Sequence, residues 1–168
     1  MKYTSAQANK LLRKRQEERD VLLYQEKLSR TFIAATTEDK ENARPAYSYS
    51  DTQAKLKKLE RDIRTIKHAI SVFNTTHFVD GFDMTVDQLL IYLPQLNERK
   101  SRLGEMASAL PKQRMSSNGR SNLIEYEYAN YDIEAAKKDY EKVCDELARA
   151  QVALDQLNNT ETMEISEE

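Results

Sequence analysis

The residues with the clearest capacity for chemistry lie between positions 111 and 131. The stretch PKQRMSSNGRSN, residues 111–122, carries three basic side chains and no acidic one, and three tyrosines follow it. Guanidinium groups bind phosphate through paired hydrogen bonds, and flat aromatic rings stack on nucleotide bases. This pattern favours a pocket for an anionic, nucleotide-like ligand. Its expected contact residues are Lys112, Arg114, Asn118, Arg120, Tyr126 and Tyr128.

A plainer interpretation of the same residues is an ordinary polar loop followed by tyrosines that pack where helices meet. The first half of the chain holds a similar set, Arg44 with Tyr47 and Tyr49. These three residues would form a second site of the same kind, or face the first one. Both interpretations of residues 111–131 stay open at this point.

No arrangement typical of an enzyme occurs in the chain. A metal site needs several His, Cys or carboxylate ligands at close spacing, whereas His68 and His77 stand nine residues apart and Cys144 is the single cysteine. We expect His68 to face solvent and Cys144 to be a small packing residue. A nucleophilic serine would need an elbow turn or a Lys or His base, and neither pattern is recognised, nor is a glycine-rich phosphate loop. The sequence therefore predicts no catalytic residue, no metal site and no cofactor.

Composition indicates which elements carry these residues. The 168 residues are 39% hydrophobic and 32% charged, with three glycines and three prolines, and the mean hydropathy is -0.79. So few turn residues exclude a β-sandwich or barrel and favour a few long helices. No run of about 18 apolar residues predicts a membrane span, and the first residues lack a secretory pattern. A cytoplasmic protein is expected.

Charge is divided unevenly along the chain. Residues 123–168 hold 13 acidic and 4 basic residues, a net charge of -9, whereas residues 1–122 carry +7. This division suits an acidic helix that packs beside basic ones, within or between subunits, or a basic face for an anionic partner. Sequence-specific binding to duplex DNA is not expected, because the whole chain is acidic and no helix-turn-helix spacing is seen.

Four long helices are predicted, over residues 4–34, 50–73, 85–110 and 131–157. A Thr or Ser followed three residues later by Gln, a pattern that caps helix starts, begins the first three at Thr4, Ser50 and Thr85. The second and fourth helices carry apolar residues three and four positions apart, as in heptad stripes. The stripe positions are Leu56, Leu59, Ile63, Ile66, Ile70 and Phe73, then Ile133, Ala136, Tyr140, Val143, Leu147, Ala150, Leu154 and Leu157.

The connecting segments give further expectations. The apolar face of the first helix is interrupted by Arg15, Arg19 and Glu26, which predicts a stripe partly lined by ion pairs. Pro94 predicts a kink or break in the third helix. Asp80-Gly81 predicts a turn, and short extended pieces are expected at 47–49, 123–128 and in the tail after residue 159.

The two halves of the chain resemble each other when the sequence is shifted by 81 residues. Thr4 then falls on Thr85 and Gln7 on Gln88, and each second helix follows a Tyr-x-Tyr. The predicted fold is all-α, with two long antiparallel helical hairpins that arise from a possible internal duplication. The first hairpin covers residues 1–84 and the second 85–168, and together they form one domain.

Narrow apolar stripes in a chain with few apolar residues are best completed by partner chains, so we expect a homo-oligomer. The function favoured by the sequence is a non-enzymatic, helical, homo-oligomeric interaction protein. The alternative is a binding protein of a phage or mobile element that sequesters the anionic nucleotide-like ligand in the Arg/Tyr pocket described above.

The stretches MTVDQLLIYLPQLNERK, IEYEYANYDIE and ALDQLNNTETMEI resemble a family of small, mostly uncharacterised helical proteins of bacteria and their prophages, some labelled septicolysin-like. The resemblance spans most of the chain. It implies helical hairpins and self-association, and it assigns no functional residue to any position.

Overall fold

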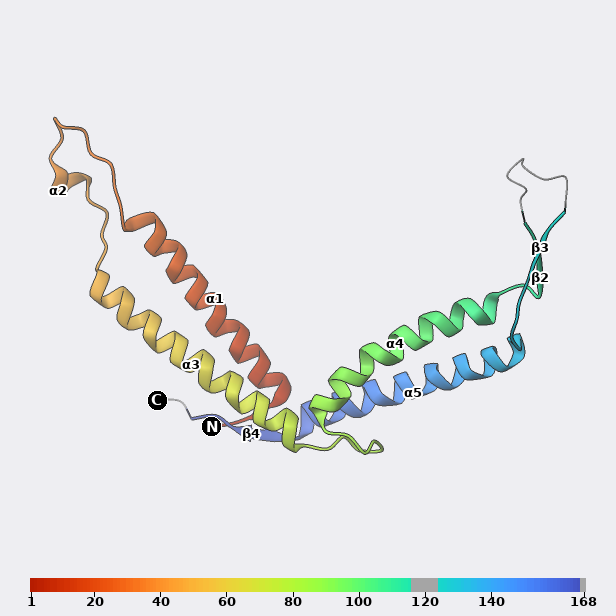
Figure 1. Ribbon diagram of the computed structural model, residues 1–168. Helices are drawn as coiled ribbons and strands as arrows, with labels where there is room; N and C mark the ends of the chain where they lie inside the picture. Colours follow the sequence, from red (N-terminus) through yellow and green to blue (C-terminus); the bar gives the residue numbers. More distant parts are fainter. Residues whose placement is uncertain (116–123, 167–168) are drawn as a thin grey trace. The chain divides into compact units, whose positions relative to one another are not determined.

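The computed structural model describes residues 1–115 and 124–166, and helices dominate it (Figure 1). The all-α class is confirmed. The described residues form five helices, which are α1 (Ser5–Ser29), α2 (Lys40–Ala43), α3 (Tyr49–Thr76), α4 (Val86–Ser108) and α5 (Ile133–Thr160). They also form four short strands, which are β1 (Lys2–Thr4), β2 (Lys112–Arg114), β3 (Tyr126–Tyr128) and β4 (Thr162–Glu164).

The chain divides into two compact units. Unit 1 comprises residues 1–76 together with 158–168, and unit 2 comprises residues 77–157. The tail belongs with the first helices because β4 pairs antiparallel with β1, with Met163 opposite Tyr3. The amide of Ile165 extends this ladder by donating to the Met1 carbonyl at 3.0 Å. The division predicted from the sequence lay at 84/85, with the tail in the second half.

In unit 1, α1 and α3 lie side by side and run in opposite directions (Figure 1). Arg15 pairs with Asp62 near one end, and Gln53 donates to Glu26 near the other. The buried side chains come mainly from α3 and from the tail, whereas α1 has no buried side chain after Ala8. The buried residues of these elements are Ser5, Ala8, Leu56, Ile63, Ile66, Phe73, Met163 and Ile165.

In unit 2, the apolar stripe of α5 packs against α4. Leu96 forms a cluster with Val143 and Leu147, and Tyr92, Leu93 and Leu103 pack around it. A Cβ atom at Gly104 would lie 3.2 Å from the ring of Tyr140, so the missing side chain leaves room for that ring to pack against α4. Six of the eight predicted stripe positions of α5 are buried, namely Ala136, Val143, Leu147, Ala150, Leu154 and Leu157.

The helix starts follow the predicted capping patterns in two of three cases. Thr4 with Gln7, and Thr85 with Gln88, form complete capping boxes before α1 and α4. The prediction at Ser50 was wrong, because α3 already begins at Tyr49 and Gln53 binds Glu26 of α1 instead. The Gln53 side chain binds the carboxylate of Glu26, a residue distant in the sequence, and not the backbone at the start of α3. The same early start makes the extended piece predicted at 47–49 wrong for its last residue.

Two further expectations have clear outcomes. Pro94 does not break α4, which continues from Val86 to Ser108 with the proline inside it. Its neighbours Leu93 and Leu96 belong to the contact with α5, and this packing offsets the lost backbone hydrogen bond. The turn at Asp80-Gly81 is confirmed, with Gly81 in the left-handed region at φ 75°.

Charge placed on either apolar stripe should disrupt the fold. Ile63 is 7% exposed and Leu147 is 5% exposed. Ile63→Asp and Leu147→Asp should each cost more than about 3 kcal/mol, since a buried carboxylate would have no partner. Urea unfolding followed by circular dichroism measures the loss. The matched control is Val152→Asp, at a site 66% exposed on α5, and unchanged stability in both core variants would contradict the assigned stripes.

Stability at alkaline pH should depend on Tyr92. Its hydroxyl donates to the carboxylate of Glu146 at 2.7 Å. The pKa of Tyr92 is raised, mainly by this hydrogen bond and to a smaller extent by burial. The unfolded chain then loses the tyrosine proton first, so this contribution to stability is present below about pH 10 and is lost as pH rises through the raised pKa.

Tyr92→Phe should therefore lower the free energy of unfolding at neutral pH by about 1 kcal/mol. It should also flatten part of the decline in stability above about pH 10. Urea titrations at neutral and alkaline pH test both effects, with the exposed Tyr24→Phe as control. An unaltered pH profile in Tyr92→Phe would show that the bond to Glu146 does not contribute.

Candidate functional site

The predicted ligand-binding residues that the structure describes lie together on a two-stranded ribbon. Strand β2 pairs antiparallel with β3, with Lys112 opposite Tyr128 and Arg114 opposite Tyr126. Side chains two apart on a strand share a face, and directly opposed residues share it too. All four side chains therefore project from one face of the ribbon. The other face carries Gln113 and Glu127.

The four residues on this face bring positive charge next to exposed aromatic rings. The Lys112 ammonium lies 3.9 Å from the centre of the Tyr126 ring and 5.4 Å from that of Tyr128. The two ring centres are 6.4 Å apart. Tyr126 is 42% exposed and Tyr128 is 62% exposed. Chemically, this face offers two cations for a phosphate and two ring surfaces for stacking.

Two of the six predicted contact residues, Asn118 and Arg120, lie outside the described residues. Tyr131, the third tyrosine of the segment, has a packing role. Its hydroxyl donates to the Met106 carbonyl at 2.9 Å, which ties the segment before α5 to the end of α4. Tyr131 therefore connects two helices, as the plainer interpretation expects, although it is 38% exposed, and Tyr126 and Tyr128 stand on the ribbon.

The similar set in the first half is used differently. Arg44 pairs with Glu41 at 3.2 Å and lies 5.8 Å from the ring of Phe32. The Tyr47 hydroxyl donates to Glu26 at 3.0 Å. The pKa of Tyr47 is raised, mainly by burial and to a smaller extent by this hydrogen bond. Tyr49 belongs to the first turn of α3. These three residues form no ribbon like the one made by β2 and β3.

The described residues include no group of three or more His, Cys, Asp or Glu side chains that could hold a metal ion. Cys144 is half-buried, and a hydrogen bond with it is the main cause that raises the pKa of Tyr140. Within the same described part of the chain, no helix combines the length and apolar character that a membrane crossing requires.

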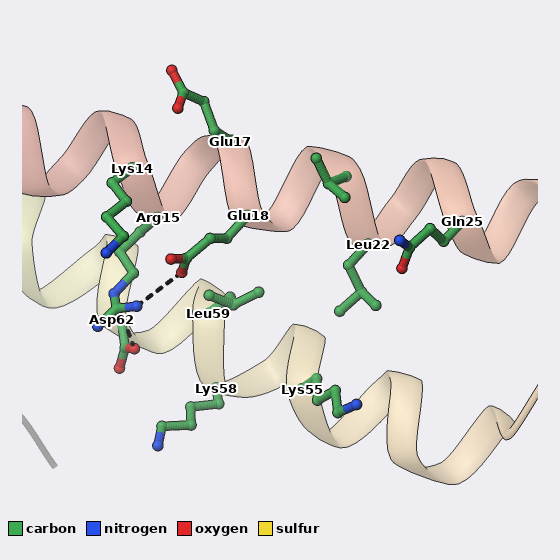
Figure 2. A pocket seen from close by; sticks show the side chains of 11 residues that line it. Lys14, Arg15, Glu17, Glu18, Leu22, Gln25, Lys55, Lys58, Leu59 and Asp62 are labelled. Atoms are coloured by element: carbon green, nitrogen blue, oxygen red, sulfur yellow. Dashed lines mark hydrogen bonds and ion pairs between the residues drawn. The ribbon is translucent and has the colours of Figure 1, made fainter.

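An open groove of about 630 Å³, which the sequence did not predict, lies between α1 and α3. Leu22 of α1 and Leu59 of α3 point into the space between the two helices, while Glu17 points away from α3 (Figure 2). Four basic and three acidic residues surround this apolar floor. The lining residues are Lys14, Arg15, Glu17, Glu18, Val21, Leu22, Gln25, Lys55, Lys58, Leu59 and Asp62.

The groove confirms the expectation that ion pairs line part of the α1 stripe. Arg15 pairs with Glu18 at 2.8 Å and with Asp62 at 3.9 Å, and the first pair is drawn in Figure 2. The interrupted apolar face of α1 was the available signal for this groove. It could not locate the groove, because the partner residues come from α3, some 40 positions away in sequence.

Unit 1 also exposes several large apolar residues of α1 and of the segment after it. Contact with water is unfavourable for each of them. Among the described residues of 21–33, the exposed large hydrophobic residues are Val21, Leu23, Tyr24, Leu28, Phe32 and Ile33.

Comparison with known proteins shows a fold and no activity. No protein-family model matches the chain, and no curated protein matches it. Among solved structures, the chain is similar to one described as the crystal structure of a functionally unknown conserved protein from Corynebacterium diphtheriae. The match has a TM-score of 0.59 at 17% sequence identity and covers 98% of this chain and 100% of the other. The two proteins thus share a fold.

Proposed function

We propose that the protein is a non-enzymatic, helical interaction protein that acts as a homo-oligomer in the cytoplasm. The observation that supports this proposal most is the state of α1. Its described residues after Ala8 include no buried side chain. Four of its apolar residues, Val21, Leu23, Tyr24 and Leu28, are exposed. Apolar residues in water contribute little stability, because helical stability in proteins comes mostly from packing of an apolar face. A partner chain would provide that packing.

The two units are, in this proposal, helical hairpins that descend from one duplicated unit. The capping boxes support this view, since Thr4-Gln7 and Thr85-Gln88 begin α1 and α4 in the same way. The second long helix has 28 residues in each case, Tyr49–Thr76 and Ile133–Thr160. We also propose that the chain is related to the small helical proteins of bacteria and prophages, some labelled septicolysin-like, that it resembles in sequence.

Self-association should make size and stability depend on protein concentration. Sedimentation velocity and thermal unfolding, carried out over about a hundredfold range of concentration, should show a growing oligomer and a rising Tm. Such coupling arises because dilution favours dissociation, and a dissociated chain exposes α1. A monodisperse monomer with a constant Tm over that range would contradict the proposal.

A second candidate function is the sequestration of an anionic nucleotide-like ligand by a phage or mobile-element protein. The face of the ribbon formed by Lys112, Arg114, Tyr126 and Tyr128 favours it, because cations and exposed rings stand together there. A phosphate would contact the basic side chains, and a base would stack on a tyrosine ring.

Nucleoside mono-, di- and triphosphates should then raise the Tm, as any ligand that binds only the folded state does. Arg114→Ala and Tyr126→Ala should abolish this rise, since each removes one of the two kinds of contact. Gln113→Ala, on the opposite face of the same ribbon, is the matched control. If no phosphate ligand changes the Tm of the wild-type protein, this second function is wrong.

A further inference from the structure

Four residues of α3 line the groove, Lys55, Lys58, Leu59 and Asp62, and three of them form a row with a self-complementary order. Lys55, Leu59 and Asp62 all line the groove, and their spacing of four and then three residues places them in one row along the helix. The row reads basic, apolar, acidic. Leu59 therefore stands between two opposite charges at nearly equal distances along the helix axis.

The two charged ends of this row differ in how they are satisfied within the chain. Lys55 forms no ion pair within the described residues. Asp62 is paired with Arg15 only at the long distance of 3.9 Å, and its side chain is 22% exposed. Both groups can accept an additional partner of opposite charge, and the intervening Leu59 is half-buried.

When two identical helices pack antiparallel about a two-fold axis, the residue at the axis meets itself and flanking residues meet in exchange. An axis beside Leu59 would bring the two Leu59 side chains together. It would also set Lys55 of each helix opposite Asp62 of the other. The same row in a parallel pair would oppose lysine to lysine, so the charge order favours the antiparallel arrangement.

We propose that the groove between α1 and α3 is covered by the same groove of a second copy of this chain, with the two α3 helices antiparallel across a two-fold axis beside Leu59. The occupant is a second copy because the lining mixes four basic and three acidic residues, which suits a surface of the same mixed charge better than a uniformly charged partner. This inference rests on the proposed self-association and specifies its interface.

A charge exchange between two chains tests the arrangement. Lys55→Glu alone would set a new carboxylate opposite Asp62 of the other copy, and Asp62→Lys alone would oppose two lysines. Each variant by itself should lose at least about tenfold in dimer affinity, because like charges meet twice across the axis. An equimolar mixture should recover association as a heterodimer, because both cross-axis pairs then join opposite charges.

In that heterodimer the two cross-axis pairs are of the same kind. The chain with Lys55→Glu presents two carboxylates and the chain with Asp62→Lys presents two ammonium groups, so every cross-axis contact joins a carboxylate to an ammonium. The mixture should therefore associate at least as well as the wild-type protein.

Sedimentation velocity on each variant and on the mixture gives the result, and circular dichroism checks that both variants are folded. Recovery in the mixture supports the interface, since a folding defect in either chain would persist there. If the wild-type protein associates but both variants associate as well as it does, this interface is wrong and self-association stands. If the wild-type protein is a monomer, the proposed function fails together with the inference.

Disulfide trapping provides a second measurement that does not depend on charge. Leu59→Cys, combined with Cys144→Ala, should give a covalent dimer under mild oxidation, because the two Leu59 positions meet at the axis. The control is Lys57→Cys in the same background, an exposed position that does not line the groove. Equal trapping at positions 57 and 59, or none at 59 in an associating protein, would overturn the proposed axis.

Discussion

The structure depends on the burial of one narrow apolar stripe along each of two long helices. On α3 the stripe includes Leu56, Ile63 and Ile66, and on α5 it includes Val143 and Leu147. Each such side chain contributes about 1.5–3 kcal/mol when it is fully removed from water. A stripe one residue wide can be covered by one neighbouring helix, and the remaining faces of both helices then stay in water. These water-facing sides of the helices account for the high share of charged residues, 32% of the chain.

This geometry explains why the helices of the two units differ in burial. In unit 2, α4 contributes Leu96 to a cluster with α5, and Gly104 allows the ring of Tyr140 to come close. In unit 1, α1 meets α3 partly through the ion pairs of Arg15, which keep water nearby. Exposed ion pairs contribute at most about 1 kcal/mol each. The groove beside them leaves Leu22 and Leu59 incompletely covered, and self-association is the proposal that accounts for it.

The ribbon of β2 and β3 serves a different purpose from the stripes. Its charged and aromatic side chains are exposed, so they add little to the stability of unit 2. The short distance between Lys112 and Tyr126 nevertheless gives the face a defined arrangement, because a cation over a ring is attracted by the ring's electrons. The ligand proposal follows from that arrangement, and the self-association proposal follows from the uncovered faces of unit 1. The two proposals can hold together, since they use different residues.

Local pattern in the sequence determined the helical class, the stripe positions and two of the helix starts. Heptad spacing places Ile66 and Leu154 on buried faces, and Thr4 and Thr85 bond to glutamines only three residues away, so nearby residues suffice for these features. The alternation at 126–128 likewise indicated β3 and, with it, the ribbon residues that the structure brings onto one face.

Contacts between distant residues decided the rest. Gln53 binds Glu26 instead of capping α3, the tail joins unit 1 through β1, and the groove between α1 and α3 exists only where both helices meet. Such features depend on which surfaces come together in space, and spacing along one helix carries no information about the side chains of another.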